Sequence, residues 1–366
     1  MKLTIEKSDL SPALLQTRKL VKASNTIPVL NNILLMAEGG QLSISATDLD
    51  RMLNVSIPAD VVQSGAVTVP AHKLADIVSK LPDGCQIAID STDDGRITVK
   101  AGRSRFYLPV LPVDDFPNMA AGEFPVTFEL DSLILEEAMA SVGFAMSNEE
   151  VRYYLNGIFI HINADQMICV ATDGHRLAKY EMTAPQGTED MPGIILPRSC
   201  VEAIKSLFPK KQQAIQIYVS NALIRFVIDN YILTSKLIDA EYPVYQRVIP
   251  QDNNLIAAIN RVNLIRAVER MSVLTPEKSR AVQFICQNNA LTLETANTDN
   301  GQATETLDID YSDQAYTGSY NASYLLDVLN HLDGEYVTIK LSDCEAPAIL
   351  TGLSDSLLIV LTARKV

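Results

Sequence analysis

The chain lacks the features of a secreted or membrane-spanning protein. No uncharged apolar run reaches the roughly 18 residues that a membrane-spanning helix needs. The opening segment, MKLTIEKSDL, has no apolar stretch of the kind that signal peptides carry. We therefore expect a cytoplasmic location and no membrane contact.

The sequence also lacks the common marks of metal sites, redox centres and several enzyme classes. Its five cysteines lie far apart without a C-x-x-C pair, so we expect reduced thiols and no zinc site. No G-x-S-x-G, H-E-x-x-H or P-loop motif is present, and we expect no cofactor. The cysteines are Cys85, Cys169, Cys200, Cys286 and Cys344.

Positive charge is scarce over the chain as a whole. There are 30 lysines and arginines against 44 aspartates and glutamates, which gives a formal net charge of −14. This balance argues against a protein that coats nucleic acid with its entire surface, but it allows a local basic face.

What the chain does contain is a threefold internal repeat. Segments that begin KLTIEKSDLSPALLQTRKLV, PVTFELDSLILEEAMASVGF and NLIAAINRVNLIRAVERMSV lead to QLSISATDLD, QMICVATDGH and ALTLETANTD. Ala46, Ala171 and Ala296 mark the same point, 125 residues apart each time. A second shared block reads TVPAHKLADIVSKLPDG, ILPRSCVEAIKSLFPKK and SYNASYLLDVLNHLDGE. The repeat predicts three copies of one domain, at residues 1–124, 125–252 and 253–366.

Residue periods within a copy predict both helices and strands. Apolar residues alternate from Leu42 to Ala46, as in a half-buried strand. Apolar residues spaced by three and four within 10–21 and 74–81 predict amphipathic helices. We expect an α+β fold of three repeated domains, each with two helices packed on antiparallel sheets.

Basic residues concentrate on the predicted helices, off their apolar stripes. Solvated helix surface is the ordinary explanation for any one helix. Recurrence in all three copies favours a functional basic face. These residues are Arg18, Lys19, Lys22, Lys73, Lys80, Arg198, Lys205, Lys210, Lys211, Arg266 and Arg270.

The segment ATDGHRLAKYEM places Asp173, His175 and Arg176 within four residues of one another. One alternative is a hydrolase that uses Asp173 and His175, but it needs a nucleophile or metal ligands that the sequence does not show. Asp-Gly between two apolar stretches indicates a tight turn instead, and the first copy has an aspartate, Asp48, at the same point without a histidine. We favour a turn whose side chains line a surface pocket.

The preceding segment, VRYYLNGIFI, suggests a surface role. If residues 151–160 form a strand, Tyr153 and Tyr154 point to opposite faces, so at least one ring is exposed. An exposed ring beside Arg152 suits a protein partner or stacking on nucleic-acid bases. The alternative is one core ring and one incidental surface ring.

The segments VRYYLNG, ATDGHRLA, TSKLIDAEYPVYQRVIP and VLNNILL together resemble the bacterial sliding clamp family, the beta subunit of DNA polymerase III. The resemblance covers the whole chain. It implies the DNA clamp fold, in which two chains join head to tail into a six-domain ring whose helices line the hole. It also implies sequence-independent binding of double-stranded DNA, without catalysis by the clamp itself.

The resemblance further implies partners and binding residues. The partners are the DNA polymerase III catalytic subunit, an ATP-dependent clamp loader, and other polymerases and repair proteins that carry clamp-binding peptides. A peptide pocket between the second and third domains would comprise Arg152, Tyr154, Leu155, Thr172, Gly174, His175, Arg176, Leu177, Pro243, Arg247, Val248, Asn321, Tyr324, Val360, Leu361 and Arg364. DNA contacts are expected at Lys22, Lys73, Tyr153, Tyr154, Arg198, Lys205, Arg266 and Arg270. The dimer contact would use Arg96, Arg103, Arg105, Phe106 and Leu108 against Val273 and Leu274.

The chain departs from the family pattern at three places. The usual Met-Pro-Met-Arg tail reads Leu361-Thr362-Ala363-Arg364, and Ser24 stands where an arginine often reaches DNA. The acidic run that usually faces the dimer arginines is reduced to TDNGQATE, leaving Asp299 and Glu305. A scaffold that binds only proteins remains the second alternative to a clamp.

Overall fold

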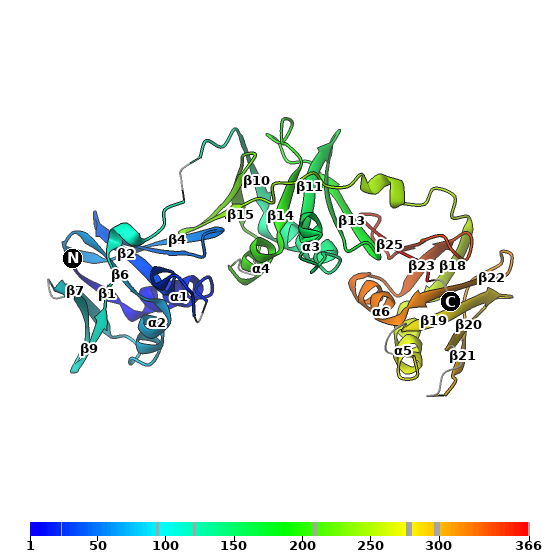
Figure 1. The fold of residues 1–366 in the computed structure, drawn as a ribbon, viewed down its shortest axis with the longest axis horizontal. Coiled ribbons are helices and arrows are strands. Elements are labelled where there is room, and N and C mark those ends of the chain that lie inside the picture. The colour runs from blue at the N-terminus through cyan, green and yellow to red at the C-terminus, as the bar shows by residue number, and fades with distance from the viewer. Residues whose placement is uncertain are drawn as a thin grey trace. The chain divides into compact units, whose positions relative to one another are not determined.

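A computed structural model describes residues 1–22, 24–92, 95–119, 122–207, 211–275, 280–295 and 301–364, with Thr92 described by its backbone alone. The predicted positions Lys210, Ala296 and Asp299 lie outside these residues. The chain divides into two compact units. Figure 1 labels their helices and strands. Unit 1 comprises Met1–Leu133, Gln186–Asp190 and Glu202–Leu237, and unit 2 comprises Ile134–Pro185, Met191–Val201 and Ile238–Val366.

The predicted helices form in pairs, one pair for each repeat. The first helix of each copy follows directly on a short strand, and the second lies about 65 residues later. They are α1 (Lys7–Thr17), α2 (Ala71–Ser79), α3 (Ser132–Gly143), α4 (Arg198–Leu207), α5 (Arg261–Ser272) and α6 (Ala322–His331).

Unit 1 contains two antiparallel sheets. The smaller has the strand order β5-β1-β7-β8-β9 and the larger β10-β15-β16-β17-β4-β3-β2-β6. Their strands are β1 (Lys2–Glu6), β2 (Asn32–Glu38), β3 (Gln41–Thr47), β4 (Arg51–Pro58), β5 (Asp60–Gln63), β6 (Gly65–Pro70), β7 (Gln86–Thr92), β8 (Arg96–Ala101), β9 (Ser104–Pro109), β10 (Val126–Asp131), β15 (Ala214–Val219), β16 (Leu223–Ile228) and β17 (Tyr231–Lys236).

Unit 2 repeats this arrangement with one eight-stranded and one four-stranded sheet. Their orders are β14-β11-β12-β13-β25-β24-β23-β18 and β21-β20-β19-β22. The strands are β11 (Gly157–Asn163), β12 (Gln166–Thr172), β13 (Arg176–Thr183), β14 (Ile194–Pro197), β18 (Leu255–Asn260), β19 (Ala281–Gln287), β20 (Ala290–Thr295), β21 (Thr304–Asp308), β22 (Tyr316–Asn321), β23 (Tyr336–Leu341), β24 (Ala348–Thr351) and β25 (Leu357–Leu361).

Both large sheets join one sequence repeat to the next. In unit 1, β4 of the first copy pairs with β17 of the second, with Met52 opposite Thr234. In unit 2, β13 of the second copy pairs with β25 of the third, with Leu177 opposite Val360. Backbone hydrogen bonds therefore run without interruption across each of these two repeat boundaries.

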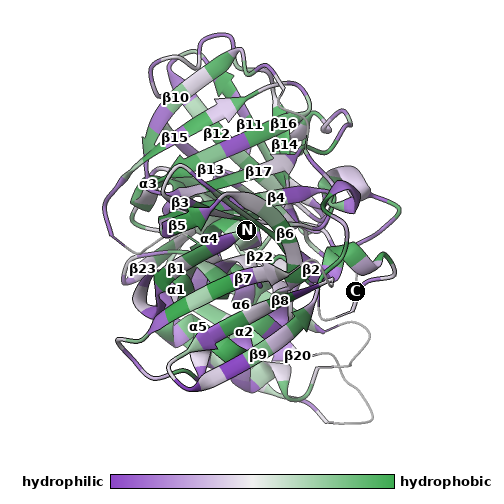
Figure 2. Cartoon of the chain, turned by 90° about the vertical axis from the view of Figure 1, so that its left-hand side faces the viewer, coloured by the Kyte–Doolittle hydropathy of each residue, from purple (hydrophilic) through white to green (hydrophobic). Residues whose placement is uncertain are grey.

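The burial of side chains confirms the predicted strand alternation. Leu42, Ile44 and Ala46 are fully buried, with partly exposed serines between them. Green and purple residues accordingly alternate along many strands and helices in Figure 2. The core of each unit lies between the apolar faces of its sheets and the helices that pack on them.

The predicted extent of the first helix was wrong. The α-helix ends at Thr17, and residues 18–21 continue in tighter i to i+3 turns, such as the bond from Val21 N to the Arg18 carbonyl at 3.2 Å. Val21 is still buried, because a tighter coil returns it to the same face. The basic residues Lys19 and Lys22 therefore follow the helix rather than lie on it.

Candidate functional site

The segment from Thr172 to Arg176 is the predicted tight turn between β12 and β13. The Asp173 Oδ1 atom accepts hydrogen bonds from the backbone N–H groups of His175 and Arg176, at 2.9 and 3.0 Å. Its Oδ2 atom accepts from Arg176 Nε at 3.2 Å. Gly174 has a φ of +87°, which glycine adopts at no steric cost. The Asp173 carboxylate thus organises the turn, and its side-chain partner is Arg176 rather than the His175 ring.

The first repeat contains the same turn with other side chains. Asp48 Oδ1 accepts from Arg51 N at 2.7 Å, and Asp48 Oδ2 accepts from Arg51 Nε at 3.1 Å. Thr47 Oγ1 donates to the Arg51 carbonyl at 2.8 Å, as Thr172 Oγ1 donates to the Arg176 carbonyl at 2.7 Å. Recurrence without a histidine indicates that the Asp-Arg pair serves the fold.

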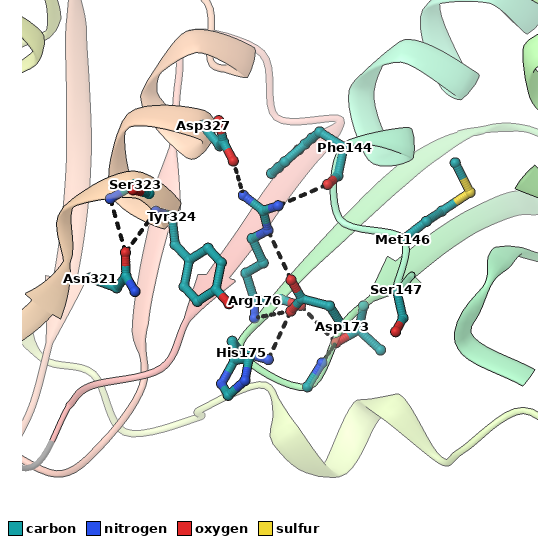
Figure 3. A network of polar contacts seen from close by, with 12 residues as sticks. Phe144, Met146, Ser147, Asp173, His175, Arg176, Asn321, Ser323, Tyr324 and Asp327 are labelled. Atoms are coloured by element: carbon teal, nitrogen blue, oxygen red, sulfur yellow. Dashed lines mark hydrogen bonds and ion pairs between the residues drawn. The ribbon is translucent and has the colours of Figure 1, made fainter. Parts of the chain in front are cut away.

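Arg176 is the centre of a polar cluster that joins three segments of unit 2 (Figure 3). Only 10% of its side chain is exposed. Its Nη1 atom lies 2.5 Å from Asp327 Oδ2 in α6, and its Nη2 atom donates to the Phe144 carbonyl at 3.1 Å. The guanidinium carbon also lies 5.2 Å from the Phe144 ring centroid and 4.9 Å from that of Tyr324. A planar, permanently charged guanidinium suits such a buried junction.

A pocket of about 470 Å³ opens beside this turn, wholly within unit 2. Its floor is apolar, because Leu155, Leu177 and Val360 belong to one buried cluster with Tyr242 and Tyr245. Arg152, Arg176 and Arg247 stand around this apolar area. Such a pocket can bury an apolar side chain and orient it through a few polar groups.

Most residues that were predicted for peptide binding line this pocket. They are Arg152, Tyr154, Leu155, Thr172, Gly174, Arg176, Leu177, Pro243, Arg247, Val248 and Val360.

The other predicted pocket residues lie behind or beside the wall. The His175 ring stacks on Tyr324 at 5.5 Å, and Tyr324 in turn lies against Arg176. Asn321 caps α6 by accepting from Ser323 N at 2.9 Å. Leu361 is buried in β25, and the Arg364 backbone N–H donates to the Ser319 carbonyl at 2.8 Å.

Five further residues complete the wall and were not predicted: Val244, Tyr245, Pro250, Pro347 and Thr362. Three of them lie in PVYQRVIP, where prolines flank the 3₁₀ helix η4 (Tyr245–Val248), a visible signal of a fixed loop. The Tyr245 hydroxyl lies 3.0 Å from His161 Nε2, and burial raises the pKa of this tyrosine to about 12. Pro347 and Thr362 belong to the third repeat, and no sequence pattern around them indicates a place in the pocket wall.

Arg152 lies against the turn itself. Its Nη2 atom pairs with Glu149 Oε1 at 2.6 Å, and this bond holds the pKa of Glu149 below its usual range. A Cβ atom added at Gly174 would lie 2.7 Å from Arg152 Nη1. A glycine at position 174 therefore avoids the backbone strain of a positive φ and leaves room for the arginine.

The residues predicted to contact DNA differ in their surroundings. Lys22, Lys73, Lys205 and Arg266 are exposed. Arg198 is half-buried, and its Nη2 atom donates to the carbonyls of Met146 and Ser147 at 2.9 and 3.2 Å. Arg270 is an ion-pair partner of Glu305, with Nε to Oε2 at 2.9 Å.

The expectation of a strand at Tyr153 and Tyr154 was wrong. Both rings belong to the 3₁₀ helix η3 (Tyr153–Leu155), which precedes β11. Tyr153 is 53% exposed, so at least one ring is exposed as expected, while Tyr154 is partly buried in the pocket wall.

The residues predicted for the dimer contact lie in or next to β8 and β9 and just after α5. Strand β9 is the outer strand of its sheet; it carries the exposed Arg105 and the half-buried Phe106, and the exposed Arg103 precedes it. Arg96 is exposed in β8, whereas Leu108 is buried within its own unit. Val273 is 79% exposed just after α5, and Leu274 beside it is half-buried.

The described residues form neither a membrane-spanning helix nor a metal site. Over the described ranges, no helix combines the length and apolar character needed to cross a membrane. Within the same residues, no three histidine, cysteine or acidic side chains come together as a metal site.

Comparison with known proteins relates the whole chain to one family. Residues 1–120, 129–244 and 246–362 match the N-terminal, central and C-terminal domains of the DNA polymerase III beta subunit. The beta sliding clamp of Caulobacter vibrioides is 40% identical over 360 residues, covering 97% of each chain. That of Escherichia coli K12 is 34% identical over 346 residues, covering 94% of this chain and 93% of its own.

Solved structures agree with this relation. The DNA polymerase III subunit beta of Pseudomonas aeruginosa superposes with a TM-score of 0.97 at 33% identity, over all of both chains. The sliding clamp of Bartonella birtlesii, crystallised bound to griselimycin, gives a TM-score of 0.95 at 37% identity, also over all of both chains. With three domains matched in order along the chain, the protein belongs to the DNA polymerase III beta subunit family, the bacterial beta sliding clamps.

Proposed function

We propose that the chain closes into a head-to-tail homodimeric ring around duplex DNA and holds its partners through the pocket beside Gly174. The general function follows from the family, because a beta sliding clamp is a non-catalytic processivity factor of DNA polymerase. It works in replication together with the polymerase, and we place it in the cytoplasm, where bacterial DNA is copied. The observation that carries the site assignment is the apolar pocket formed by two repeats.

We propose that this pocket binds short peptides of the replicative polymerase, the ATP-dependent loader, and other polymerases and repair proteins. Leu155, Leu177 and Val360 would receive an apolar peptide side chain, while Arg152 and Arg247 would fix the peptide's direction. Tyr154 and Val248 would border the peptide. His175, Tyr324 and Asn321 would act by supporting Arg176 and the start of α6.

We propose that exposed basic residues hold DNA by attraction to its phosphates. Lys22, Lys73, Lys205 and Arg266 are the strongest candidates, because each is exposed and would keep its full charge for the duplex. Arg198 and Arg270 are weaker candidates, since their guanidinium groups already bind protein oxygens. Tyr153 is exposed enough to pack against the sugar-phosphate backbone.

We propose domain boundaries at 1–124, 125–252 and 253–366, which keep each repeat whole and lie close to the matched family ranges. The dimer would join Arg96, Arg103, Arg105, Phe106 and Leu108 of one copy to Val273 and Leu274 of the other. An exposed valine beside a half-buried leucine supports this proposal, because it gives the contact an apolar centre.

Retention on DNA tests the enclosing ring. The chain, placed on nicked circular DNA by its loader and ATP, should remain bound through gel filtration and should leave after a restriction enzyme linearises the circle. Light scattering should give twice the 40.1 kDa mass of one chain. A monomer at all concentrations, or equal loss from circular and linear DNA, would favour a scaffold that binds only proteins.

Peptide titration tests the pocket separately. Leu177→Ala and Arg247→Ala should each weaken a labelled peptide from the polymerase by about tenfold or more, because they remove buried apolar area and a charged contact. Both variants should still form the dimer. Lys80→Ala, on the surface of unit 1, is the control and should bind the peptide normally. Unchanged affinity in both pocket variants would refute the site.

A further inference from the structure

Unit 1 contains a second pocket, of about 480 Å³, that lies at the repeat-equivalent position of the first. Met52 in β4 pairs with Thr47 on one side and Thr234 on the other. Leu177 in β13 pairs in the same way with Thr172 and Val360. The two pockets therefore stand on the same strand positions, 125 residues apart.

The segment beside each pocket is also equivalent. Phe116 and Pro117 line the second pocket, and their counterparts are Tyr242, in the buried cluster under the first pocket, and Pro243, in its wall. Met119 likewise corresponds to Tyr245. In both cases the segment packs on the buried strand residue, Met52 or Leu177. The fold thus builds the same kind of apolar recess twice, once in each unit.

The second pocket carries its positive charge at a wall position that has no arginine in the first. Arg225 in β16 pairs with Thr234, whereas the matching residue in unit 2 is Ile349, which pairs with Val360. Among the described residues that line the second pocket, Arg225 is the charged one and no carboxylate accompanies it. The recess therefore presents an uncompensated positive charge, although the chain as a whole is acidic.

Arg225 is held in place but keeps binding capacity. Its guanidinium lies 4.6 Å above the Phe124 ring, and Nε donates to Thr234 Oγ1 at 3.2 Å. Within the described part of the chain, neither terminal nitrogen makes a hydrogen bond or an ion pair. Two parallel N–H donors fixed at the wall of a recess match the geometry of a carboxylate.

We propose that this second pocket is a binding site for acidic linear peptides of partner proteins, distinct from the site beside Gly174. An Asp or Glu side chain would pair with Arg225, and a neighbouring leucine or methionine would enter the recess between Met36 and Met119. The thioether side chains there adapt to apolar groups of different shape, which suits peptides of varied sequence. The inference goes beyond the proposed function, since it needs neither the first pocket nor DNA.

Methionine-methyl NMR tests this directly. Met36, Met52 and Met119 line the second pocket, while the described residues that line the first include no methionine. The probe is acetyl-Met-Asp-Leu-Asp-Gly-amide, titrated into full-length chain labelled at its methionine methyl groups. The matched control peptide carries asparagine in place of both aspartates. The acidic probe should shift the signals of these three methyl groups, each assigned by a Met→Leu variant.

Two variants separate the sites. Arg225→Gln should weaken the acidic probe by at least about tenfold, while Arg225→Lys should keep part of the affinity. Leu177→Ala, which impairs the first pocket, should leave the three shifts intact. The proposal is overturned if the three methyl signals do not move, if the asparagine peptide binds as well, or if Leu177→Ala abolishes the shifts. Thermal unfolding and dimer mass should match the unmodified chain, so that loss of binding is not loss of fold.

Discussion

At the scale of single residues, the two equivalent turns differ at one position with a thermodynamic consequence. Gly174 has φ +87°, and its counterpart Leu49 has φ +79°. A side chain in this region costs about 1–2 kcal/mol, and Leu49 recovers little of it because 40% of the residue is exposed. We expect Leu49→Gly to raise the free energy of unfolding by about 0.5–1 kcal/mol, after the entropy of the added glycine is subtracted.

Urea unfolding measures this effect as a higher midpoint with an unchanged slope. Gly174→Ala is the matched reverse change, and it should lower the midpoint because an alanine at a φ of +87° is strained. A lower midpoint for Leu49→Gly would mean that the exposed leucine makes contacts that outweigh its backbone strain.

The burial of His161 predicts how the stability of the folded chain depends on pH. Burial holds the pKa of His161 below its ordinary 6.5, against smaller opposing effects of the Ile162 backbone and Glu181. As the pH falls below about 6.5, the unfolded chain binds a proton that the folded chain does not, so the free energy of unfolding decreases. The loss ends below the folded-state pKa, where both forms are protonated.

Urea unfolding at pH values above and below 6.5 tests whether the chain becomes less stable as the pH falls. His161→Gln keeps a polar partner for the Tyr245 hydroxyl, which lies 3.0 Å from His161 Nε2, but it cannot titrate. Its midpoint should depend less on pH than that of the unmodified chain. Identical pH dependence of the two proteins would show that other groups control the acid response.

The sequence predicts the turn at residues 172–176 but not the surroundings of Arg176. Asp-Gly specifies a turn locally, because both residues favour its backbone angles. Besides Asp173, Arg176 binds the Phe144 carbonyl and Asp327, which lie 32 and 151 residues away along the chain. No local pattern contains such pairs. In the sequence, this nearly buried arginine therefore looks like any other charged residue beside a turn.

At the scale of secondary-structure elements, helix α5 offers a comparison between two arginines one turn apart. Arg266 and Arg270 are both exposed, but Arg270 pairs with Glu305 in β21. Because Arg270 must share its charge with a carboxylate, we expect Arg266→Ala to weaken binding of a short duplex more than Arg270→Ala does. The slope of log affinity against log salt should fall by about one for Arg266→Ala.

Fluorescence anisotropy over a salt series measures both quantities. A double variant, Arg270→Ala with Glu305→Gln, removes the pair without changing the net charge and should bind DNA nearly as the unmodified chain does. Equal losses from the two arginine variants would show that DNA displaces Glu305 from Arg270.

The spacing of apolar residues predicts where helices and strands lie, but it does not predict well where they end. The apolar spacing from Leu10 to Val21 continues past Thr17 because an i to i+3 coil keeps nearly the same face buried. Likewise, Tyr153 and Tyr154 lie in a 3₁₀ turn that exposes one ring and partly buries the other. Two successive residues of a strand would show the same difference in exposure. Burial patterns report which side of the backbone faces the core, and two backbone conformations can satisfy the same pattern.

At the scale of the whole molecule, the repeat predicts three copies, while the pairing between them depends on contacts distant in sequence. Strand β4 pairs with β17, about 180 residues later, and β13 pairs with β25 at a similar separation. These pairings create both pockets, because each pocket needs a strand from two successive repeats. Hence the residues of the first pocket could be predicted from the family resemblance. Those of the second pocket become apparent only from the strand register of the structure.

The dimer contact gives the last prediction. Arg103 is exposed just before β9 and Arg105 is exposed within it, but Glu305, one of the two acidic residues expected to face them, already pairs with Arg270. Exposed ion pairs contribute only about 0–1 kcal/mol each, so apolar contact around Val273 should dominate the association. We expect the dimer dissociation constant to change by less than about tenfold between low and moderate salt.

Sedimentation over a dilution series measures this constant directly. Val273→Asp should raise it by at least about tenfold, because the change places a charge at the centre of the proposed contact. Val62→Asp is a matched control, since Val62 is 66% exposed on β5, at the opposite edge of the sheet from β9. A dissociation constant that rises steeply with salt, together with a small effect of Val273→Asp, would assign the association to the arginines. Acidic partners for them would then have to come from residues other than Glu305.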